Sequence, residues 1–356
     1  MKPISEQRRL SVSNATITPS SLSPLTSQSL LKTLAVLKGH TDVVNDLSWS
    51  PDGKYIATAS DDETVFVWEV EGLGRRYIEA SEPAGAYGIA KKSNVSTASL
   101  ADSISRSAVI NSNAHVEAVA WSGDGSMLAI AGGYDGSVML WSSYTKKIVA
   151  ILKGHSRAVN CLSWSLDSKQ LASSSRECLV WDVGQRAVAA TLRGNDVDVK
   201  AVAFSPDGLH LASGGDDHKT RVWSILAEEL RADFGGIYSV TGVAWSPDGG
   251  KLASVDASSS VLLWDVKGKK LIHTLKGENV RCKPTKLAFS PDGRVLAVPR
   301  GERVRLLDVA GWTRGAELQG HAGMVTAVAF SPDGGLVATA SEDGTARVWG
   351  AGRGGE

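Results

Sequence analysis

Residues 325–349 read VTAVAFSPDGGLVATASEDGTARVW. The part that ends at Phe330 alternates apolar and smaller residues, which predicts a short strand. Ser-Pro-Asp-Gly, beginning at Ser331, then predicts a tight turn: proline fixes the first φ, aspartate bonds its own backbone, and glycine adopts positive φ. A second strand, a turn around Asp343 and a third strand ending in Trp349 complete the pattern. The stretch is therefore expected to form an antiparallel meander.

The same pattern recurs along the chain. The tetrapeptide stands at Ser50, Ser205, Ser246, Ser290 and Ser331, and degenerate copies begin at Ser122 and Ser165. Successive starts lie 40–44 residues apart except for the first interval, which is 72. An aromatic residue precedes every copy: Trp49, Trp121, Trp164, Phe204, Trp245, Phe289 and Phe330. Room for a fourth strand remains between units, for example at residues 147–152, so we expect seven units of four strands and almost no helix.

Composition excludes several classes of protein. The 356 residues carry 38 basic and 38 acidic side chains, and 42% are apolar, which argues against a disordered chain. No run of ~18 apolar residues could span a membrane. The zero net charge lacks the basic excess that is typical of nucleic-acid binders.

The three cysteines, Cys161, Cys178 and Cys282, fit neither a zinc spacing nor a disulfide framework. They are interpreted as small buried hydrophobes in a reducing compartment. Because the N-terminus lacks the apolar core of a secretory signal, an intracellular location is expected.

The units resemble the WD-repeat family, in which Gly-His opens a unit and Trp-Asp closes it. The matching pairs are Gly39-His40, Gly154-His155, Gly320-His321, Trp181-Asp182 and Trp264-Asp265. The resemblance covers roughly residues 34–350 and implies an all-β fold: a seven-bladed β-propeller of four-stranded antiparallel blades. It also implies that the N-terminal strand, Leu34 to Leu37, joins the last blade and closes the ring.

Two terminal segments are expected to lie outside the ring. Residues 1–33 are rich in Ser and Thr and predict a disordered tail, with Thr18-Pro19 and Ser23-Pro24 as candidate phosphorylation sites. This tail also faintly resembles an organelle transit peptide. Residues 351–356 are expected to form a flexible C-terminal tail.

An insertion interrupts the second unit. Trp68 and Trp141 are 73 residues apart, against 40–43 between later equivalents, so about 31 residues are extra. If Arg75 to Ala80 is the fourth strand of blade 1, residues 81–113 form an inserted Ser-rich loop. The alternative takes Ser105 to Ile110 as that strand and moves the insertion to the opposite face. The spacing from Trp68 favours the first.

A Ser/Thr, His and Asp set resembles a hydrolase triad. It occurs twice with a tryptophan, as His40, Thr58, Asp62 and Trp68 and as His321, Thr339, Asp343 and Trp349. The family resemblance implies instead a buried hydrogen-bond network within each blade, and an active site would hardly be built twice. The set is incomplete in blades 3, 5 and 6, at Ser175, Ser258 and Gly301 with Leu307, so looser blades are predicted there.

Function in the family is protein binding on the faces of the ring. The resemblance implies that two positions per unit reach the narrow face: the residue four before the first-strand aromatic and the residue before the turn aspartate. The first set is Asn45, Glu117, Asn160, Lys200, Thr241, Thr285 and Thr326. The second is Asp61, Tyr134, Asp216 and Glu342, with Arg300 from the irregular turn of blade 6.

Tyr134 and Arg300 are the strongest single candidates, because binding hot spots favour Tyr, Trp and Arg. Asp61, Glu117 and Glu342 come from neighbouring blades and predict an acidic arc for a basic peptide. Trp312 falls outside the repeat phase and would either anchor a partner or pack against its own blade.

The sequence therefore predicts a non-catalytic scaffold for protein or peptide partners, in a multiprotein complex of the cytoplasm or nucleus, without cofactor, metal or membrane segment. Its glycine pairs lack phosphate-loop spacing, and residues 61–63 lack the alternating ligands of a calcium loop. Two alternatives stay open. One is an enzyme with a site in the central channel, and the other is a nucleic-acid contact through the basic N-terminal tail.

Overall fold

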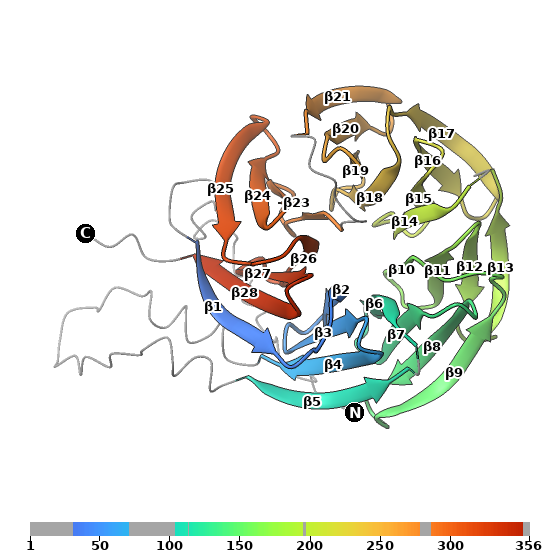
Figure 1. Ribbon diagram of the computed structural model, residues 1–356. Helices are drawn as coiled ribbons and strands as arrows, with labels where there is room; N and C mark the ends of the chain where they lie inside the picture. Colours follow the sequence, from blue (N-terminus) through green and yellow to red (C-terminus); the bar gives the residue numbers. More distant parts are fainter. Residues whose placement is uncertain (1–30, 71–103, 113, 195–196, 278–285, 352–356) are drawn as a thin grey trace, which may run out of the picture.

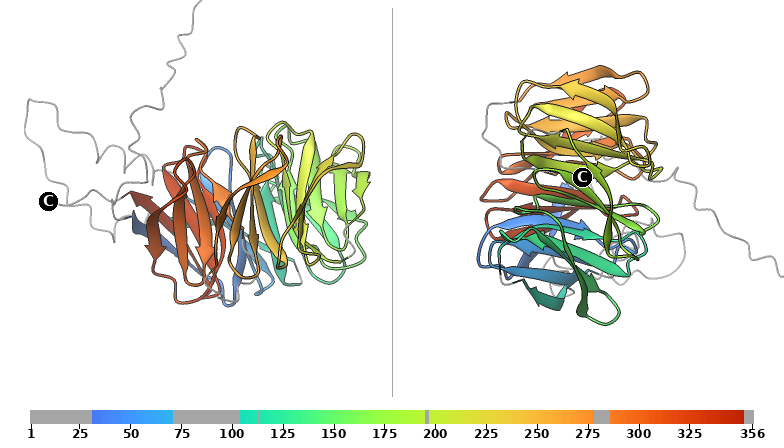
Figure 2. Two further views of the ribbon diagram at one scale, coloured as in Figure 1. Left: turned by 90° about the horizontal axis from the view of Figure 1, so that it is seen from above. Right: turned by 90° about the vertical axis from the view of Figure 1, so that its right-hand side faces the viewer.

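The seven repeat units fold into seven separate four-stranded antiparallel sheets. The computed structural model describes residues 31–70, 104–112, 114–194, 197–277 and 286–351, and these contain 28 strands and no helix. The sheets stand side by side around a central axis (Figure 1), and the left-hand view of Figure 2 shows the blades upright next to one another. The described chain is a seven-bladed β-propeller, which confirms the predicted fold class.

Each blade contributes one strand to each of four concentric layers. The strands nearest the axis are β2 (Val44–Trp49), β6 (Val116–Trp121), β10 (Cys161–Trp164), β14 (Val199–Phe204), β18 (Val240–Trp245), β22 (Ala288–Phe289) and β26 (Val325–Phe330). The second layer is β3 (Tyr55–Ser60), β7 (Met127–Gly132), β11 (Gln170–Ser174), β15 (His210–Gly215), β19 (Lys251–Asp256), β23 (Val295–Arg300) and β27 (Leu336–Ser341).

The third layer is β4 (Thr64–Glu69), β8 (Ser137–Ser142), β12 (Cys178–Asp182), β16 (Lys219–Ser224), β20 (Val261–Asp265), β24 (Arg303–Asp308) and β28 (Thr345–Ala351). The outer strands are β5 (Ser105–Asn111), β9 (Lys147–Lys153), β13 (Ala187–Leu192), β17 (Glu229–Gly235), β21 (Lys270–Leu275), β25 (Thr313–Gln319) and, for blade 7, β1 (Leu31–Lys38).

The Ser-Pro-Asp-Gly turn joins the first two strands of a blade through its own side chains. In blade 1 the Ser50 hydroxyl donates to Asp52 over 2.6 Å and accepts the Tyr55 N–H over 2.9 Å. Gly53 has a φ of 70°, a conformation that costs glycine least. The turn thus fixes where the second strand begins, and its repetition gives the blades a common register.

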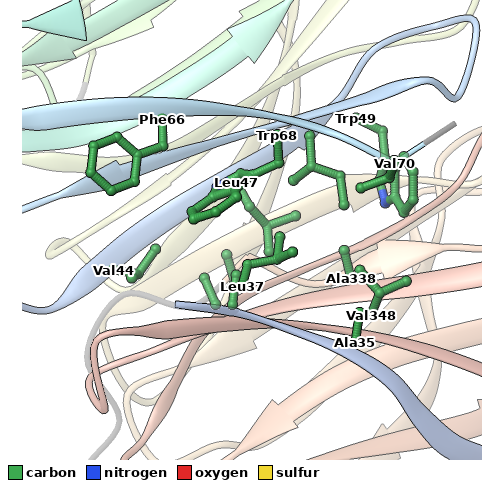
Figure 3. Close-up of a cluster of buried hydrophobic side chains, with 14 of the residues drawn as sticks. Ala35, Leu37, Val44, Leu47, Trp49, Phe66, Trp68, Val70, Ala338 and Val348 are labelled. Atoms are coloured by element: carbon green, nitrogen blue, oxygen red, sulfur yellow. The ribbon is translucent and has the colours of Figure 1, made fainter. Parts of the chain in front are cut away.

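Strand β1 closes the ring. It pairs antiparallel with β28, from Leu31 opposite Ala351 to Lys38 opposite Thr345. Ala35 and Leu37 are buried in a cluster with side chains of blades 7 and 1, including Leu47, Trp68 and Val348 (Figure 3). The N-terminal strand therefore completes blade 7 and also fills the seam between blades 7 and 1.

The favoured position of the insertion was wrong, and the alternative that takes Ser105 to Ile110 as the fourth strand is confirmed. The outer strand of blade 1 is β5, whose Arg106 lies opposite Trp68 and whose Asn111 lies opposite Thr64. Its Arg106 guanidinium also lies 4.4 Å from the centre of the Phe66 ring, a contact that short-range spacing cannot reveal. Residues 105–111 are thus strand rather than loop, and Arg75–Ala80 lies outside the described residues.

The limits of the ring also differ by a few residues from those predicted. Leu31 to Thr33 belong to β1 rather than to an N-terminal tail, and Ala351 ends β28. The remaining tail residues, 1–30 and 352–356, lie outside the described part of the chain.

Two truncations test the closure. Removal of residues 1–30 should leave the melting temperature unchanged, because β1 stays intact. Removal of residues 1–38 should lower it by roughly 5–10 °C, because Leu37 leaves the core and β28 becomes an open edge. Thermal unfolding followed by circular dichroism measures both, and equal melting temperatures would contradict the closure.

Candidate functional site

The first set of predicted rim residues converges on the central channel. Asn45, Glu117, Asn160, Lys200, Thr241 and Thr326 line one cavity of about 80 Å³, together with Asp46, Cys161, Ala201 and Lys286. The six predicted residues all lie near the start of an innermost strand. The end of the ring at which these strands begin is named the narrow face. Thr285 lies outside the described residues. The repeat phase therefore places six predicted residues around a single opening.

Several of these side chains hold neighbouring blades together. The amide of Asn45 donates to the Val116 carbonyl over 3.0 Å, and that of Asn160 donates to the Val199 carbonyl over 2.8 Å. The Thr326 hydroxyl donates to the Val44 carbonyl over 2.6 Å. Each bond runs from one blade to the next, so the channel wall is also part of what keeps the ring together.

Three predicted contact residues are not available to a partner. Thr241 and Thr326 are buried in the channel wall. Arg300 is only 9% exposed, because β23 extends to include it and its guanidinium donates to the Lys276 carbonyl over 3.1 Å. Arg300, one of the two strongest candidates from the sequence, is thus buried instead of presented to a partner.

The side chains of the second set lie around the channel mouth and differ in how far they are exposed to solvent. Asp61 accepts a hydrogen bond from Asn45 over 2.6 Å, and Asp216 lies 3.3 Å from the Lys200 ammonium. Glu342 is half-buried, whereas Tyr134 is 85% exposed and meets the His115 ring edge-on, with ring centres 5.0 Å apart. Tyr134 is thus the large rim side chain that a partner can reach.

A second cavity of about 240 Å³ lies beside the channel mouth. It is lined by Tyr134, Ser156, Arg157, Ala158, Asn160, Ser175 and Asp198. Asn160 belongs to both cavities, so they adjoin. The Arg157 side chain is 62% exposed and lies 3.9 Å from Asp198, a separation at which an exposed ion pair contributes little stability. Its guanidinium can therefore reorient toward a partner.

The two hydrolase-like sets form buried hydrogen-bond networks inside blades 1 and 7. In blade 7, the His321 ring contacts Asp343 through Nδ1 and Thr339 through Nε2, both over 2.8 Å. The Trp349 indole donates to the same Thr339 hydroxyl over 2.8 Å. His40, Asp62, Thr58 and Trp68 repeat this arrangement in blade 1 within 0.1 Å. Neither set lines the two narrow-face cavities, and each hydroxyl already accepts an indole N–H.

In blades 3, 4 and 5 the tryptophan indole still donates to a serine hydroxyl, although the rest of the network differs. Trp181, Trp223 and Trp264 donate to Ser173, Ser213 and Ser254 over 2.7, 2.9 and 3.0 Å. In blade 3 the acid partner of His155 is Glu177, at 3.4 Å, instead of an aspartate. The looser packing predicted for blades 3, 5 and 6 stays a prediction.

Burial sets the protonation of the network. Desolvation lowers the pKa of His40 and His321 despite the facing carboxylates. Burial works to raise the pKa of Asp343, but hydrogen bonds from Thr345, the Ala322 N–H and His321 lower it to about 2. Each histidine is therefore neutral at pH 7, with Nδ1–H donating to the carboxylate and Nε2 accepting from the threonine.

Sequence reasoning missed Asp46, Arg157, Asp198 and Lys286. Asp46 and Lys286 share one signal, since each stands three residues before a first-strand aromatic. Trp312 packs at the seam of blades 5 and 6, where it stacks on His273 of blade 5 with ring centres 5.2 Å apart. It is neither an exposed anchor nor confined to its own blade.

Comparison with known protein families matches the repeats directly. The WD40 family (WD domain, G-beta repeat) matches residues 31–69, 187–224, 230–265 and 312–350. The WD40 domain of anaphase-promoting complex subunit 4 matches residues 103–167. Matched repeats and seven observed blades together make this chain a WD-repeat β-propeller.

Curated relatives include several WD-repeat proteins. "Cell division cycle 20.5, cofactor of APC complex" of Arabidopsis thaliana is 28% identical over 196 residues, covering 53% of this chain and 38% of that protein. "WD repeat-containing protein slp1" of Schizosaccharomyces pombe is 26% identical over 260 residues, or 69% of this chain and 52% of the relative. "Periodic tryptophan protein 2" of Arabidopsis thaliana is 30% identical over 222 residues, or 58% and 24%. The chain thus spans about half or less of the length of these relatives.

Among the described residues, no helix is long and apolar enough to cross a membrane. Within the same residues, no group of three or more His, Cys, Asp or Glu side chains is placed to hold a metal ion.

Removing the shared hydroxyl of the blade 7 network should destabilise the ring. Thr339→Val leaves the Trp349 indole and the His321 Nε2 without their partner, which should lower the free energy of unfolding by about 2–4 kcal/mol. Ile130→Val, at the equivalent apolar position of blade 2, is the control and should cost about 0.5–1.5 kcal/mol. Urea unfolding measures both, and an equal loss would show that the network adds nothing beyond packing.

Acidification should weaken the ring through the same networks. The folded pKa of His40 and His321 lies below the ordinary 6.5, so the unfolded chain binds more protons as the pH falls through that value. Stability should therefore decline below about pH 6.5. Asp343 adds a further loss between about pH 4 and 2. Melting temperatures from pH 7.5 to 5.5 should fall less steeply in a His40→Gln, His321→Gln double variant, and an unchanged slope would refute this linkage.

Proposed function

We propose that this propeller is a non-catalytic platform that binds a segment of a partner protein on its narrow face. The observation that carries the proposal is the pair of adjoining cavities that share Asn160, with the 85% exposed Tyr134 at their edge. Binding hot spots are enriched in Tyr and Arg, and here the exposed Tyr134 lines the same cavity as the exposed Arg157 guanidinium. Because strands fix the positions of the lining residues, a partner would lose little free energy to ordering them.

The charge around the channel mouth favours a partner segment with a basic side chain. Asp61, Glu117 and Glu342 come from blades 1, 2 and 7, which adjoin through the closure. The basic side chain Lys200 is already engaged by Asp198 and Asp216, at 3.5 and 3.3 Å. Rim charges of this kind raise the association rate more than the affinity.

The relatives support membership of a multiprotein complex. Two of the matched Arabidopsis proteins carry the description "cofactor of APC complex". By analogy, we place this chain among proteins that hold a partner for a larger assembly in the cytoplasm or nucleus. The buried networks of blades 1 and 7 support a non-catalytic role, since their hydroxyl groups stabilise indoles instead of facing a cavity.

The chain offers a matched pair of tyrosines for the test. Tyr134 is 85% exposed at the narrow face, and Tyr144 is 81% exposed in the turn after β8, at the opposite end of the blade. A Tyr134→Ala, Arg157→Ala variant should lose the main partners in a quantitative pull-down, with recovery reduced roughly 10-fold or more. Tyr144→Ala should retain them.

Equal melting temperatures of the variants would show that both rings are intact. Identical partner sets for the two variants and the unaltered protein would refute binding at the narrow face. Loss of partners only in Tyr144→Ala would move the binding surface to the opposite face.

A further inference from the structure

A carboxylate lies deep in the channel wall. The Asp46 side chain is only 2% exposed, and it belongs to the innermost strand of blade 1. Its oxygens accept the Leu47 N–H over 2.8 Å and the Val119 N–H of blade 2 over 2.9 Å. Burial raises the pKa of Asp46 above its usual range, against the lowering effect of Lys286. A buried carboxylate of this kind is costly unless a cation accompanies it.

The cation is the ammonium group of Lys286, a residue of blade 6, which is separated from Asp46 by blade 7. The Lys286 ammonium donates to Asp46 Oδ2 over 2.5 Å, although the two residues are 240 positions apart. The Lys286 backbone N–H donates to the Thr326 carbonyl of blade 7, and the residue forms a parallel bridge to Ala327. Its side chain is 33% exposed, so the ammonium borders the channel cavity.

The repeat phase explains how the lysine reaches so far. Asp46, Lys286 and Ala327 all stand three residues before the first-strand aromatic of their blades. In the intervening blade 7 this position is the small Ala327, which leaves room for the lysine stem. Blades 2, 4 and 5 also have small residues there: Ala118, Ala201 and Gly242.

We propose that Asp46 and the small channel-wall residues form a binding site for one primary alkylammonium group, and that Lys286 of the same chain occupies it. The site recognises a primary ammonium through the buried carboxylate, and the neighbouring blades supply space for an alkyl stem. A partner lysine that reached this depth would have to displace Lys286. In the intact protein, a partner segment on the narrow face can therefore contact the channel mouth, but Lys286 blocks its access to Asp46.

Chemical rescue tests the site. Lys286→Ala should lower the melting temperature by roughly 4–7 °C, because it leaves Asp46 buried without a cation. Added n-propylammonium chloride should restore the loss in a saturable way. Tetramethylammonium chloride at equal concentration is the control, since it has the charge but no N–H to donate, and it should restore little. The unaltered protein, whose site is filled, should respond equally weakly to both salts.

Asp46→Asn in the Lys286→Ala background should abolish the response to n-propylammonium. The proposal is wrong if both salts shift the single variant equally, or if the double variant responds as strongly as the single one. Should Lys286→Ala fail to fold, refolding is attempted with each salt. Recovery of the β circular dichroism signal with n-propylammonium alone supports the site, and no recovery, or recovery with both salts, overturns it. The double variant should fold without either salt, because it buries no lone charge.

Discussion

The antiparallel pairing of β1 with β28 is the contact on which the rest of the ring depends. In six blades the outer strand directly follows the third strand in the sequence. In blade 7 the outer strand is formed by residues 31–38, which lie more than 300 positions before the third strand, β28. The two ends of the ring are therefore joined by backbone hydrogen bonds and by the buried Leu37. Only a closed ring can bring blades 6, 7 and 1 close enough for Thr326 to bond Val44 and for Lys286 to reach Asp46. The contacts that line the channel therefore depend on closure of the ring.

The channel wall serves two purposes at once. Asn45, Asn160 and Thr326 face the axis, where a scaffold could use them for recognition, yet each donates a hydrogen bond to the neighbouring blade. A side chain with its donor committed to the backbone has less left to offer a partner. The freer groups stand one step further out, at Tyr134 and Arg157, whose exposed side chains border the second cavity. This division explains why the proposed binding surface is centred beside the channel and not within it.

Repetition made most of the fold predictable, and loss of repetition marks where prediction failed. The turn and aromatic positions recur in every unit, so blade number and strand order could be expected from the sequence, and the resemblance to the WD-repeat family implied the two hydrogen-bond networks. The fourth strand of blade 1 was the less favoured of two alternatives, because Ser105–Asn111 carries a weak apolar pattern and packs through contacts such as Arg106 over Phe66. Arg300 was misplaced because β23 runs on to include it, in a blade without the usual closing tryptophan. Lys286 and Asp46 share a repeat position, but no local pattern shows that one reaches the other across blade 7.

Blade 6 shows how a ring tolerates a degenerate unit. Its innermost strand spans only Ala288–Phe289, and Leu307 stands where five other blades carry a tryptophan that donates to a hydroxyl. Two interactions outside the repeat lie at this blade: the Lys286–Asp46 ion pair on the inside and the Trp312–His273 stack against blade 5. Each connects blade 6 to another blade instead of stabilising it internally. Because every blade is packed between two others, a unit that has lost its own fastener can be held by its neighbours. The least regular unit is therefore connected to blades 1 and 5 by two contacts that the repeat pattern does not supply.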